Sequence, residues 1–433
     1  MTNFIAKPAN SLSGNVKVPG DKSISHRSVM LGSIARGVTE VSGLLEGDDV
    51  TSTIEAFRSM GVDIKRNNGK IIINGVGVDG LKKPAKPLYV GNSGTSMRLM
   101  SGILAAQSFD SELRGDESLS GRPMDRIIKP LTEMGATITS NDSKPPLKIS
   151  GNQQLKGISY DMPIASAQVK SCLLLAGIYA EGNTCVSEPA PTRNHTENML
   201  KGFGYKVNTK ENKMCLSGHG ELKANNIEVP GDISSAAFFM VAASISKNAD
   251  ITLNSVNVNP TRTGVIDILR LMGANIELSN HREIGGELLA DFRIQSAELT
   301  GISIPEELVP LAIDEFPAIF IAASCAKGET TLSGAKELRV KESDRIQVMA
   351  DGLKTLGIEC KVLDDGIKIF GGEYLKPSGA IKSHHDHRIS MSFAVASIRS
   401  KFDIEIEGVD NVKTSFPNFV ELANYIGMDL QEV

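Results

Sequence analysis

The residues best suited to chemistry in this sequence lie where helices are expected to begin. They are cations, hydroxyls and amides together with a carboxylate, and they recur along the chain: Lys22, Ser23, Asn92 to Thr95, Ser166, Gln168, Asp314, His387 and Arg388. A helix N-terminus presents free N–H groups and a partial positive charge. Several such ends on one face would bind an anion such as a carboxylate or a phosphate.

The segment "GNSGT" at residues 91–95 fits this chemistry. Its two glycines allow the backbone to approach a ligand closely and to turn its N–H groups inward. The same letters also suit an ordinary capped loop, so the segment alone leaves both interpretations open.

Two pairs of cations occur four residues apart, Lys341 with Arg345 and Arg122 with Arg126. On a helix, two like charges at this spacing cost a few tenths of a kcal/mol. A shared anion would offset that cost. The alternative is a solvated face on which nearby carboxylates neutralise the cations, and the candidates are Glu342, Asp344 and Asp125.

Two other motifs are considered and set aside. The run "SHHDHR" at residues 383–388 contains four potential metal ligands, but consecutive residues point in different directions and do not easily chelate one ion. The run "GVGVDG" at residues 75–80 matches a dinucleotide-binding fingerprint, but Pro84 and Pro87 forbid the helix that must follow it. We therefore expect neither a metal nor a nucleotide cofactor.

A repeat of about seventy residues supplies the helices that position these side chains. A helix-like segment ends in a glycine before a strand at six places: Gly61, Gly135, Gly204, Gly273, Gly357 and Gly427. Glycine directly after an amphipathic helix is the expected left-handed terminator. Each unit also has a second, more apolar helix, expected to begin near Lys22, Gly94, Ser166, Ser234, Asp314 or Asp386. With the β-branched runs between helices, each unit has the order β-α-β-α-β-β.

The fold class is therefore α/β, with two similar domains of three units each. The stretch "VPGD" occurs twice, at residues 18–21 and 229–232, and we take both copies as the crossovers between domains. Residues 21–230 form the first domain in this interpretation, and residues 1–20 with 231–433 form the second. A coincidence of two Pro-Gly turns, each followed by a helix cap, is the alternative.

Composition excludes several classes of protein. The 433 residues carry a formal net charge of −5 with no block of like charge, which argues against a nucleic-acid partner. The longest apolar runs are far too short for a membrane span, and the N-terminus lacks a signal-like stretch. The five cysteines are odd in number and lack CxxC spacing, which predicts reduced thiols and a cytoplasmic location.

Eight motifs in order across nearly the whole chain resemble the EPSP synthase (5-enolpyruvylshikimate-3-phosphate synthase) family, and three of them resemble its class II bacterial branch. They are "VPGDKSISHR", "GNSGTSMR", "GRPMDRI", "SAQVKS", "TRNHTE", "VKESDRI", "DHRIS" and "KTSFPNF". The resemblance implies an inside-out α/β barrel of the enolpyruvyl transferase type in each domain, joined by a two-segment hinge. It implies transfer of the enolpyruvyl group of phosphoenolpyruvate to shikimate 3-phosphate without a cofactor, in aromatic amino-acid biosynthesis.

The resemblance also assigns residues, position by position. Those expected at shikimate 3-phosphate are Lys22, Ser23, Arg27, Ser166, Gln168, Arg193, Asp314 and Lys341. Those expected at phosphoenolpyruvate are Lys22, Gly94, Arg122, Gln168, Arg345, Arg388 and Lys413. Asp314 is the expected base, and Glu342 with Lys22 the expected acid. Gly94 is also expected to face glyphosate, an inhibitor of the family. The chain departs from the wider family at Ala167 and Glu337, where other members carry Ser and Asn.

Two alternatives remain at this stage. One is the sister enzyme that transfers enolpyruvate to UDP-N-acetylglucosamine, which typically has a cysteine in the loop before its Arg-Pro motif, whereas "RGDESLSGRP" has none. The other is a non-catalytic two-domain protein that binds anions. For the EPSP synthase interpretation we expect the small molecules shikimate 3-phosphate and phosphoenolpyruvate as partners, no nucleic acid, no membrane and a monomer.

Overall fold

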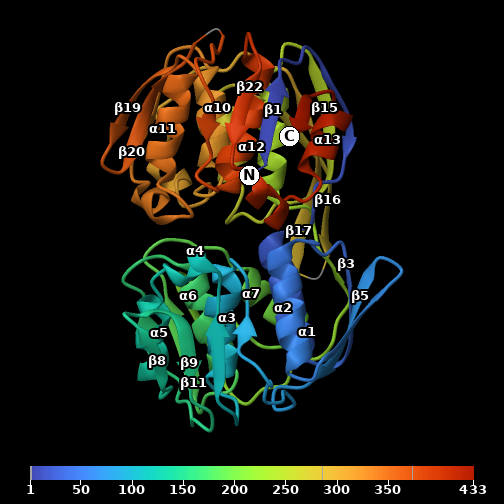
Figure 1. The fold of residues 1–433 in the computed structure, drawn as a ribbon. Helices are drawn as coiled ribbons and strands as arrows, with labels where there is room; N and C mark the ends of the chain where they lie inside the picture. Colours follow the sequence, from blue (N-terminus) through green and yellow to red (C-terminus); the bar gives the residue numbers. More distant parts are fainter. Residues whose placement is uncertain (1, 285, 373) are drawn as a thin grey trace. The chain divides into compact units, whose positions relative to one another are not determined.

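The computed structural model of the protein describes residues 2–284, 286–372 and 374–433 (Figure 1). The chain forms two compact units. We call Gly20–Val229 with Glu283–Glu287 the central unit, and the rest of the chain, Met1–Pro19, Pro230–Arg282 and Leu288–Val433, the terminal unit. Each unit is described by itself.

The central unit contains three four-stranded sheets, each accompanied by helices. The first repeat comprises α1 (Lys22–Ile34), β3 (Arg36–Ser42), α2 (Asp48–Ser59), β4 (Asp63–Asn67), β5 (Lys70–Val76) and β14 (Ile227–Glu228). The second comprises β6 (Leu88–Tyr89), α3 (Gly94–Leu104), β7 (Ser111–Arg114), α4 (Glu117–Ser120), α5 (Asp125–Glu133), β8 (Ile138–Asn141) and β9 (Lys144–Ile149). The third comprises β10 (Ser159–Asp161), α6 (Ala167–Gly177), β11 (Asn183–Ser187), α7 (His195–Gly202), β12 (Asn208–Lys210) and β13 (Lys213–Ser217).

The terminal unit repeats the pattern. Its first repeat comprises β2 (Leu12–Val16), α8 (Ile233–Ile245), β15 (Ala249–Asn257), α9 (Gly264–Leu271), β16 (Asn275–Ile284) and β17 (Glu287–Gln295). The next comprises η1 (Glu306–Leu308), α10 (Phe316–Ser324), β18 (Glu329–Leu332), η2 (Lys336–Val340), α11 (Arg345–Thr355), β19 (Glu359–Leu363) and β20 (Gly366–Phe370). The last comprises β1 (Asn3–Lys7), β21 (Ile381–Lys382), α12 (His387–Ala396), η3 (Ser397–Arg399), β22 (Ile404–Glu407), η4 (Asp410–Thr414), α13 (Phe419–Tyr425) and β23 (Asp429–Glu432).

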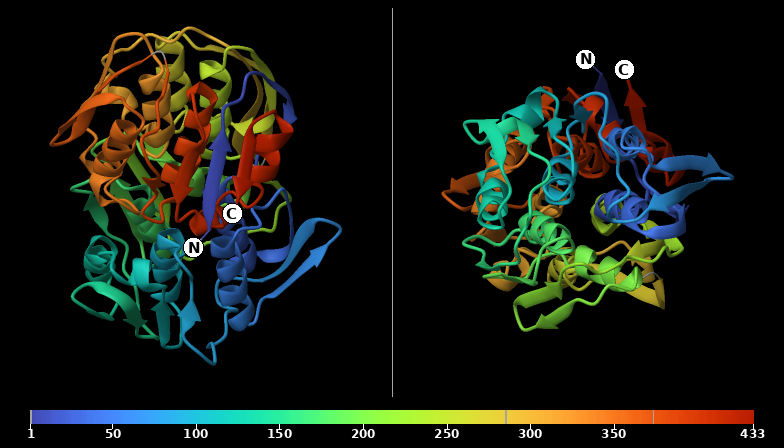
Figure 2. Two further views of the ribbon diagram at one scale, coloured as in Figure 1. Left: turned by 45° about the horizontal axis from the view of Figure 1, so that its top comes forward. Right: turned by 90° about the horizontal axis from the view of Figure 1, so that it is seen from below.

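The three sheets of the central unit share one topology, which follows from the repeated sequence. In the orders β14-β3-β5-β4, β6-β7-β9-β8 and β10-β11-β13-β12, the first strand is parallel to the second and the others pair antiparallel. The N-terminal strand β1 lies between β22 and β23, so the two chain ends lie side by side in both views of Figure 2. The predicted α/β class with three units per domain is confirmed.

The two kinds of predicted helix are both present. Every residue of α8 and of α10 is buried, because these helices are apolar on all sides and occupy the middle of the terminal unit. The helices α2, α5, α7, α9, α11 and α13 each end before one of the six repeat glycines, whose φ values lie between 78° and 106°. The predicted left-handed terminators are confirmed.

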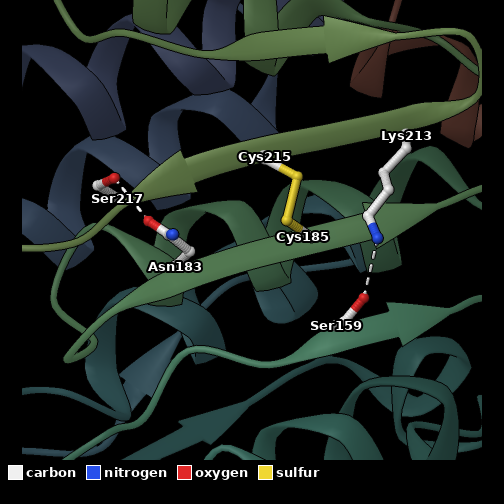
Figure 3. The surroundings of a disulfide bond; sticks show 6 residues. All are labelled: Ser159, Asn183, Cys185, Lys213, Cys215 and Ser217. Carbon is white, nitrogen blue, oxygen red and sulfur yellow. Dashed lines mark hydrogen bonds between the residues drawn. A yellow bond between two sulfur atoms is a disulfide. The ribbon is translucent and has the colours of Figure 1, made fainter.

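One expectation about the cysteines is wrong. Cys185 and Cys215 stand opposite each other on β11 and β13 and form a disulfide, with their Cα atoms 4.1 Å apart (Figure 3). The N–H of Cys185 donates to Ile158 on the other side of the strand, so the cysteines face each other at a non-hydrogen-bonded position, where opposite side chains are closest. Cys172, Cys325 and Cys360 are free.

Two other expectations can be compared with the structure. Residues 77–87, which follow the "GVGVDG" motif, contain no helix, as the prolines predict. Across the described ranges, none of the helices has both the length and the apolar character needed to cross a membrane.

Candidate functional site

The central unit gathers the N-termini of four helices. Helix α1 packs against α3 and α7, and α6 packs against α3 and α7 (Figure 1). Hydrogen bonds between side chains of different helices tie their first turns together. We call this group of helix ends and its side chains the central cluster.

Lys22 is the first residue of α1. The carboxylate of Asp21 caps the helix by accepting the N–H of Ile24 at 2.8 Å. The Lys22 ammonium lies 2.5 Å from the carboxylate of Asp49, which is almost fully buried at the start of α2. The ion pair fixes the ammonium at the helix entrance while about a quarter of the lysine side chain, 27%, stays accessible to a ligand.

Arg27 lies one turn further along α1 and is only 3% exposed. Its Nε donates to the hydroxyl of Thr196 at 2.7 Å, its Nη2 to the hydroxyl of Ser171 at 2.8 Å and its Nη1 to the carbonyl of Ser23 at 2.9 Å. None of the three acceptors is a carboxylate. Burial lowers the pKa of this guanidinium to about 10, an effect that nearby acids such as Glu197 only partly oppose. An anionic ligand would supply the charge that these acceptors lack.

Gly94 begins α3, which the hydroxyl of Ser93 caps. A Cβ atom at Gly94 would lie 2.9 Å from Nη1 of Arg98 and 3.4 Å from Nη1 of Arg122. Arg122 is held in turn by Asn92, whose side-chain oxygen accepts its Nη2 at 2.6 Å. The absence of a side chain lets two guanidinium groups approach the N-terminus of α3 closely, and such a concentration of positive charge is expected to bind an anion.

Helix α6 supplies the next part of the cluster. The hydroxyl of Ser166 caps it by accepting the N–H of Val169. Gln168 bridges to α3, because its amide nitrogen donates to Thr95 at 3.0 Å and its amide oxygen accepts Nη1 of Arg98 at 2.6 Å. The structure thus brings together the N-terminal turns of α3 and α6.

Arg193 lies in the loop that enters α7. Its charge contributes to lowering the pKa of Arg27, so the two guanidinium groups are near enough to repel each other. Behind this loop, the buried ammonium of Lys170 is paired with Glu188 at 3.0 Å and Glu197 at 2.8 Å. This buried pairing anchors both ends of the loop that carries Arg193.

The terminal unit has a comparable group of helix ends, which we call the terminal cluster. Helix α10 packs against α8, α11 and α12. Asp314 lies just before α10, and its Oδ1 is 3.5 Å from Nζ of Lys341 and 3.4 Å from Nη1 of Arg345. Asp314 does not cap α10, since the N-cap residue is Glu315. Its carboxylate is instead 15% exposed and lies between two cations.

Arg345, 1% exposed, is surrounded by carboxylates. Besides Asp314, it contacts Glu342 through Nη2 at 2.6 Å and Asp386 through Nε at 2.9 Å. Burial alone would lower the pKa of Arg345, but the three acids, Asp386 foremost, raise it above its usual value. Burial would raise the pKa of Asp386, yet the Arg345 charge holds it below its usual value. Arg345 and Asp386 therefore form a buried ion pair.

Arg388 and Lys413 differ in their position. Nη1 of Arg388, in the first turn of α12, donates to the carbonyl of Asp314 at 2.9 Å, so this guanidinium belongs to the terminal cluster. The side chain of Lys413 is 59% exposed and its ammonium lies 2.6 Å from Glu432. The structure does not bring the Lys413 ammonium together with the other predicted residues.

The expectation of paired cations on one helix is wrong. Helix α11 begins at Arg345 and α5 begins at Asp125, so Lys341 and Arg122 both precede the helix of their partner. Neither pair stands at adjacent turns of one helix, and no helical repulsion has to be offset.

Three contributing residues were missed from sequence alone: Asp49, Asp386 as a partner of Arg345, and Thr196. Asp49 had a detectable signal, because it shares a face of α2 with the buried residues Thr53 and Ala56. A carboxylate on the buried face of a helix requires a partner. The described residues contain no group of three His, Cys, Asp or Glu side chains arranged to hold a metal ion.

Comparisons with known proteins match nearly the whole chain. A family model described as EPSP synthase (3-phosphoshikimate 1-carboxyvinyltransferase) matches residues 6–422. A 3-phosphoshikimate 1-carboxyvinyltransferase of Vesicomyosocius okutanii is 70% identical over all of both chains. One from Methylococcus capsulatus is 60% identical, with 99% of this chain and 98% of the relative covered. A solved structure of an EPSP synthase from Acinetobacter baumannii matches with a TM-score of 0.92 at 57% identity over 100% of both chains.

Proposed function

The chain belongs to the EPSP synthase family. We propose that the residues of its central and terminal clusters bind the substrates of the EPSP synthase reaction and catalyse it. The enzyme transfers the enolpyruvyl group of phosphoenolpyruvate to the 5-hydroxyl of shikimate 3-phosphate and releases phosphate, in the shikimate pathway. Relatives that are 55% to 70% identical over nearly their full length carry the name of this activity. Neither UDP-N-acetylglucosamine transfer nor a purely binding role has comparable support.

Shikimate 3-phosphate is bound mainly by the central cluster in this proposal. Ser23, Arg27, Ser166, Gln168 and Arg193 supply hydroxyl, guanidinium and amide groups suited to a phosphate and a carboxylate. Support comes from Arg27, which is buried among neutral acceptors and therefore carries a charge that a phosphate can neutralise. Lys22 and Lys341 are two further residues proposed to bind shikimate 3-phosphate, together with Asp314.

Phosphoenolpyruvate is bound by Lys22, Gly94, Arg122, Gln168, Arg345, Arg388 and Lys413 in the same proposal. The support is the close approach of two guanidinium groups to Gly94 at the N-terminus of α3. Lys413 has the least support, because its ammonium is paired with Glu432.

The chemistry follows from the position of Asp314, which carries this part of the proposal. Its carboxylate lies between Lys341 and Arg345, two cations that stabilise its negative charge, and it remains partly exposed. Asp314 takes the proton of the 5-hydroxyl as the hydroxyl oxygen bonds to C2 of phosphoenolpyruvate. Glu342, with Lys22, delivers a proton to the methylene carbon, which becomes a methyl group.

The second step reverses the proton transfer. The bond between C2 and the phosphate oxygen breaks with its electron pair leaving on the phosphate, a methyl proton returns to the Glu342 carboxylate, and the carbon–carbon double bond forms again. The proton held by Asp314 passes to the departing phosphate. Cationic groups such as Arg345 and Arg388 stabilise the departing phosphate. The scheme uses no metal or organic cofactor.

Phosphate release tests the activity and its acceptor. The purified protein is mixed with phosphoenolpyruvate and shikimate 3-phosphate, and in parallel with shikimate or with UDP-N-acetylglucosamine. We expect rapid release only with shikimate 3-phosphate. Release with UDP-N-acetylglucosamine instead, or with no acceptor, would contradict the proposal.

We also propose a cytoplasmic monomer. The mixed-sign surface charge and the three free cysteines support it. The Cys185–Cys215 disulfide argues against a fully reducing compartment, so the location has to be measured. Cell fractionation tests the location, and light scattering of the purified protein tests the molecular mass.

A further inference from the structure

The second copy of the "VPGD" stretch has no lysine or arginine of its own, and the reaction scheme leaves it unused. Its Asp232 caps α8 by accepting the N–H of Ser234 at 2.8 Å. Both residues are buried. They belong to a polar network beneath the terminal cluster.

Arg262 is the cation of this network, with a side chain that is 2% exposed. Its Nη2 lies 2.6 Å from the hydroxyl of Ser234, 3.2 Å from Oδ1 of Asp232 and 3.5 Å from Oε1 of Glu315. The Ser234 hydroxyl also donates to the same oxygen of Glu315. These contacts determine the position of one carboxylate oxygen.

Glu315 links the network to the candidate site. It follows Asp314 directly, and its side chain is 1% exposed. The oxygen that Arg262 and Ser234 hold lies 3.9 Å from Nη1 of Arg388, and this same Nη1 donates to the carbonyl of Asp314. The buried Glu315 carboxylate thus contacts two arginines, Arg262 within the network and Arg388 in the terminal cluster.

We propose that Glu315 is a positioning residue, which holds the Arg388 guanidinium and the backbone at Asp314 in place, and that the second "VPGD" copy supports it through Asp232 and Ser234. The inference rests on the proposed roles of Arg388 and Asp314. It explains why the second copy keeps the aspartate and a following serine while lacking the cations of the first. The first copy contacts substrate, and the second supports residues that do.

The test substitutes Glu315→Gln, which keeps size and hydrogen bonding but removes the charge. We expect kcat/KM for phosphoenolpyruvate to fall about tenfold to a hundredfold, because small displacements of positioning groups have effects of this size. Shikimate 3-phosphate affinity, measured by calorimetry without phosphoenolpyruvate, should change less than about threefold, a margin smaller than one hydrogen bond to a charged group. Glu307→Gln, which removes one exposed acid nearby in η1, is the matched control and should match wild type.

A double variant separates positioning from general destabilisation. If Glu315 acts through Arg388, then Glu315→Gln combined with Arg388→Gln should be about as active as Arg388→Gln alone. Full additivity of the two effects, or a lowered melting temperature with unchanged kcat/KM for phosphoenolpyruvate, would overturn the inference. Partial rescue by Glu315→Asp would support it.

The same experiments distinguish this inference from the proposed site roles. If Arg388→Gln and Asp314→Asn leave turnover unchanged, the proposed roles fail. If those variants are impaired and Glu315→Gln is not, only the positioning role fails.

Discussion

Arg27 and Arg345 are both buried arginines of candidate binding clusters, yet they have opposite surroundings. Arg27, in the central cluster, donates to two hydroxyls and a carbonyl, and its pKa is lowered to about 10 by burial. Arg345, in the terminal cluster, is paired with three carboxylates that raise its pKa despite burial. In the proposed reaction, the central cluster therefore supplies positive charge to an anionic ligand, whereas the terminal cluster holds carboxylates in place for proton transfer.

The largest expected effect concerns the terminal carboxylate. Asp314→Asn keeps the side-chain size but removes the base, so we expect kcat to fall about 100- to 10,000-fold. Substrate affinities should change far less, because the cations remain. Steady-state kinetics with both substrates measure kcat and the two KM values separately. Asp351→Asn, which changes an exposed acid on α11, is the control. Near-normal turnover of Asp314→Asn would show that Asp314 is not the base.

The two arginines should respond differently to the same substitution. Arg345→Gln leaves buried carboxylates uncompensated, which costs about 3–5 kcal/mol of stability. Arg27→Gln leaves only neutral acceptors, so its main effect should be a KM for shikimate 3-phosphate raised roughly tenfold to a hundredfold, as expected for one charged hydrogen bond of about 1.5–3 kcal/mol.

Calorimetric unfolding and kinetics of both variants check this pair of outcomes. Arg293→Gln removes an exposed ion pair with Asp250 and serves as the control, with little expected loss of stability because solvent screens such a pair. Equal stability losses for Arg27→Gln and Arg345→Gln would contradict the contrast between the clusters.

A smaller effect is expected at Gly94. The added methyl group of Gly94→Ala would press on Arg98 and Arg122, whose nearest atoms would lie at 2.9 and 3.4 Å. Overpacking a tight site costs about 1–3 kcal/mol, so inhibition by glyphosate should weaken roughly tenfold to a hundredfold. The KM for the more compact phosphoenolpyruvate should rise less. Equal losses for inhibitor and substrate would show that Gly94 does not discriminate between them.

The smallest effect is a difference in acid stability between the units. Burial, with Lys22 and Arg27 nearby, holds the pKa of His26 well below 6.5. The His26 imidazole therefore stays neutral in the folded protein, whereas in the unfolded chain it is protonated below pH 6.5. The free energy of unfolding consequently falls as pH falls. The loss should be about 1.4 kcal/mol at pH 5.5 relative to pH 7.5.

The terminal unit should lose the contribution of Asp386 only at lower pH. Its lowered pKa stabilises the fold above the unfolded value of 3.8, and this contribution is lost as pH falls below that value. Unfolding scans from pH 7.5 to about pH 2.5 measure both effects. His26→Gln should flatten the pH dependence above pH 5, whereas His281→Gln, at an exposed position, should not. An unchanged slope in His26→Gln would exclude the imidazole as its cause.

Local rules were enough to predict the scaffold of both clusters. The six repeat glycines and the six buried helices follow from patterns within a few residues, and all six helices begin within two residues of the expected positions. Placing Lys22, Gly94 and Ser166 at helix N-termini needed only that information.

Contacts between residues far apart in the sequence could not be predicted from such local rules. Asp386 lies 41 residues from Arg345 and reaches it only because α11 and α12 pack together. The disulfide depends on the register of β11 against β13, where a shift of one residue would turn the two sulfurs to opposite faces. No local sequence pattern predicts either the packing of α11 against α12 or the register of β11 against β13.

The placement of β1 and β2 in the terminal unit has a consequence for synthesis on the ribosome. These strands emerge first, but their partners β15, β22 and β23 emerge much later, the last of them at the end of the chain. We propose the predicted domains, 21–230 and 1–20 with 231–433, as the folding domains. The first can then fold while the chain is still growing, and the second must wait for release, with its N-terminal strands exposed to other nascent chains. Since Val433 and Asn3 are hydrogen-bonded, a circular permutant that begins at Asp21 would make each proposed domain continuous and remove this early exposure of β1 and β2.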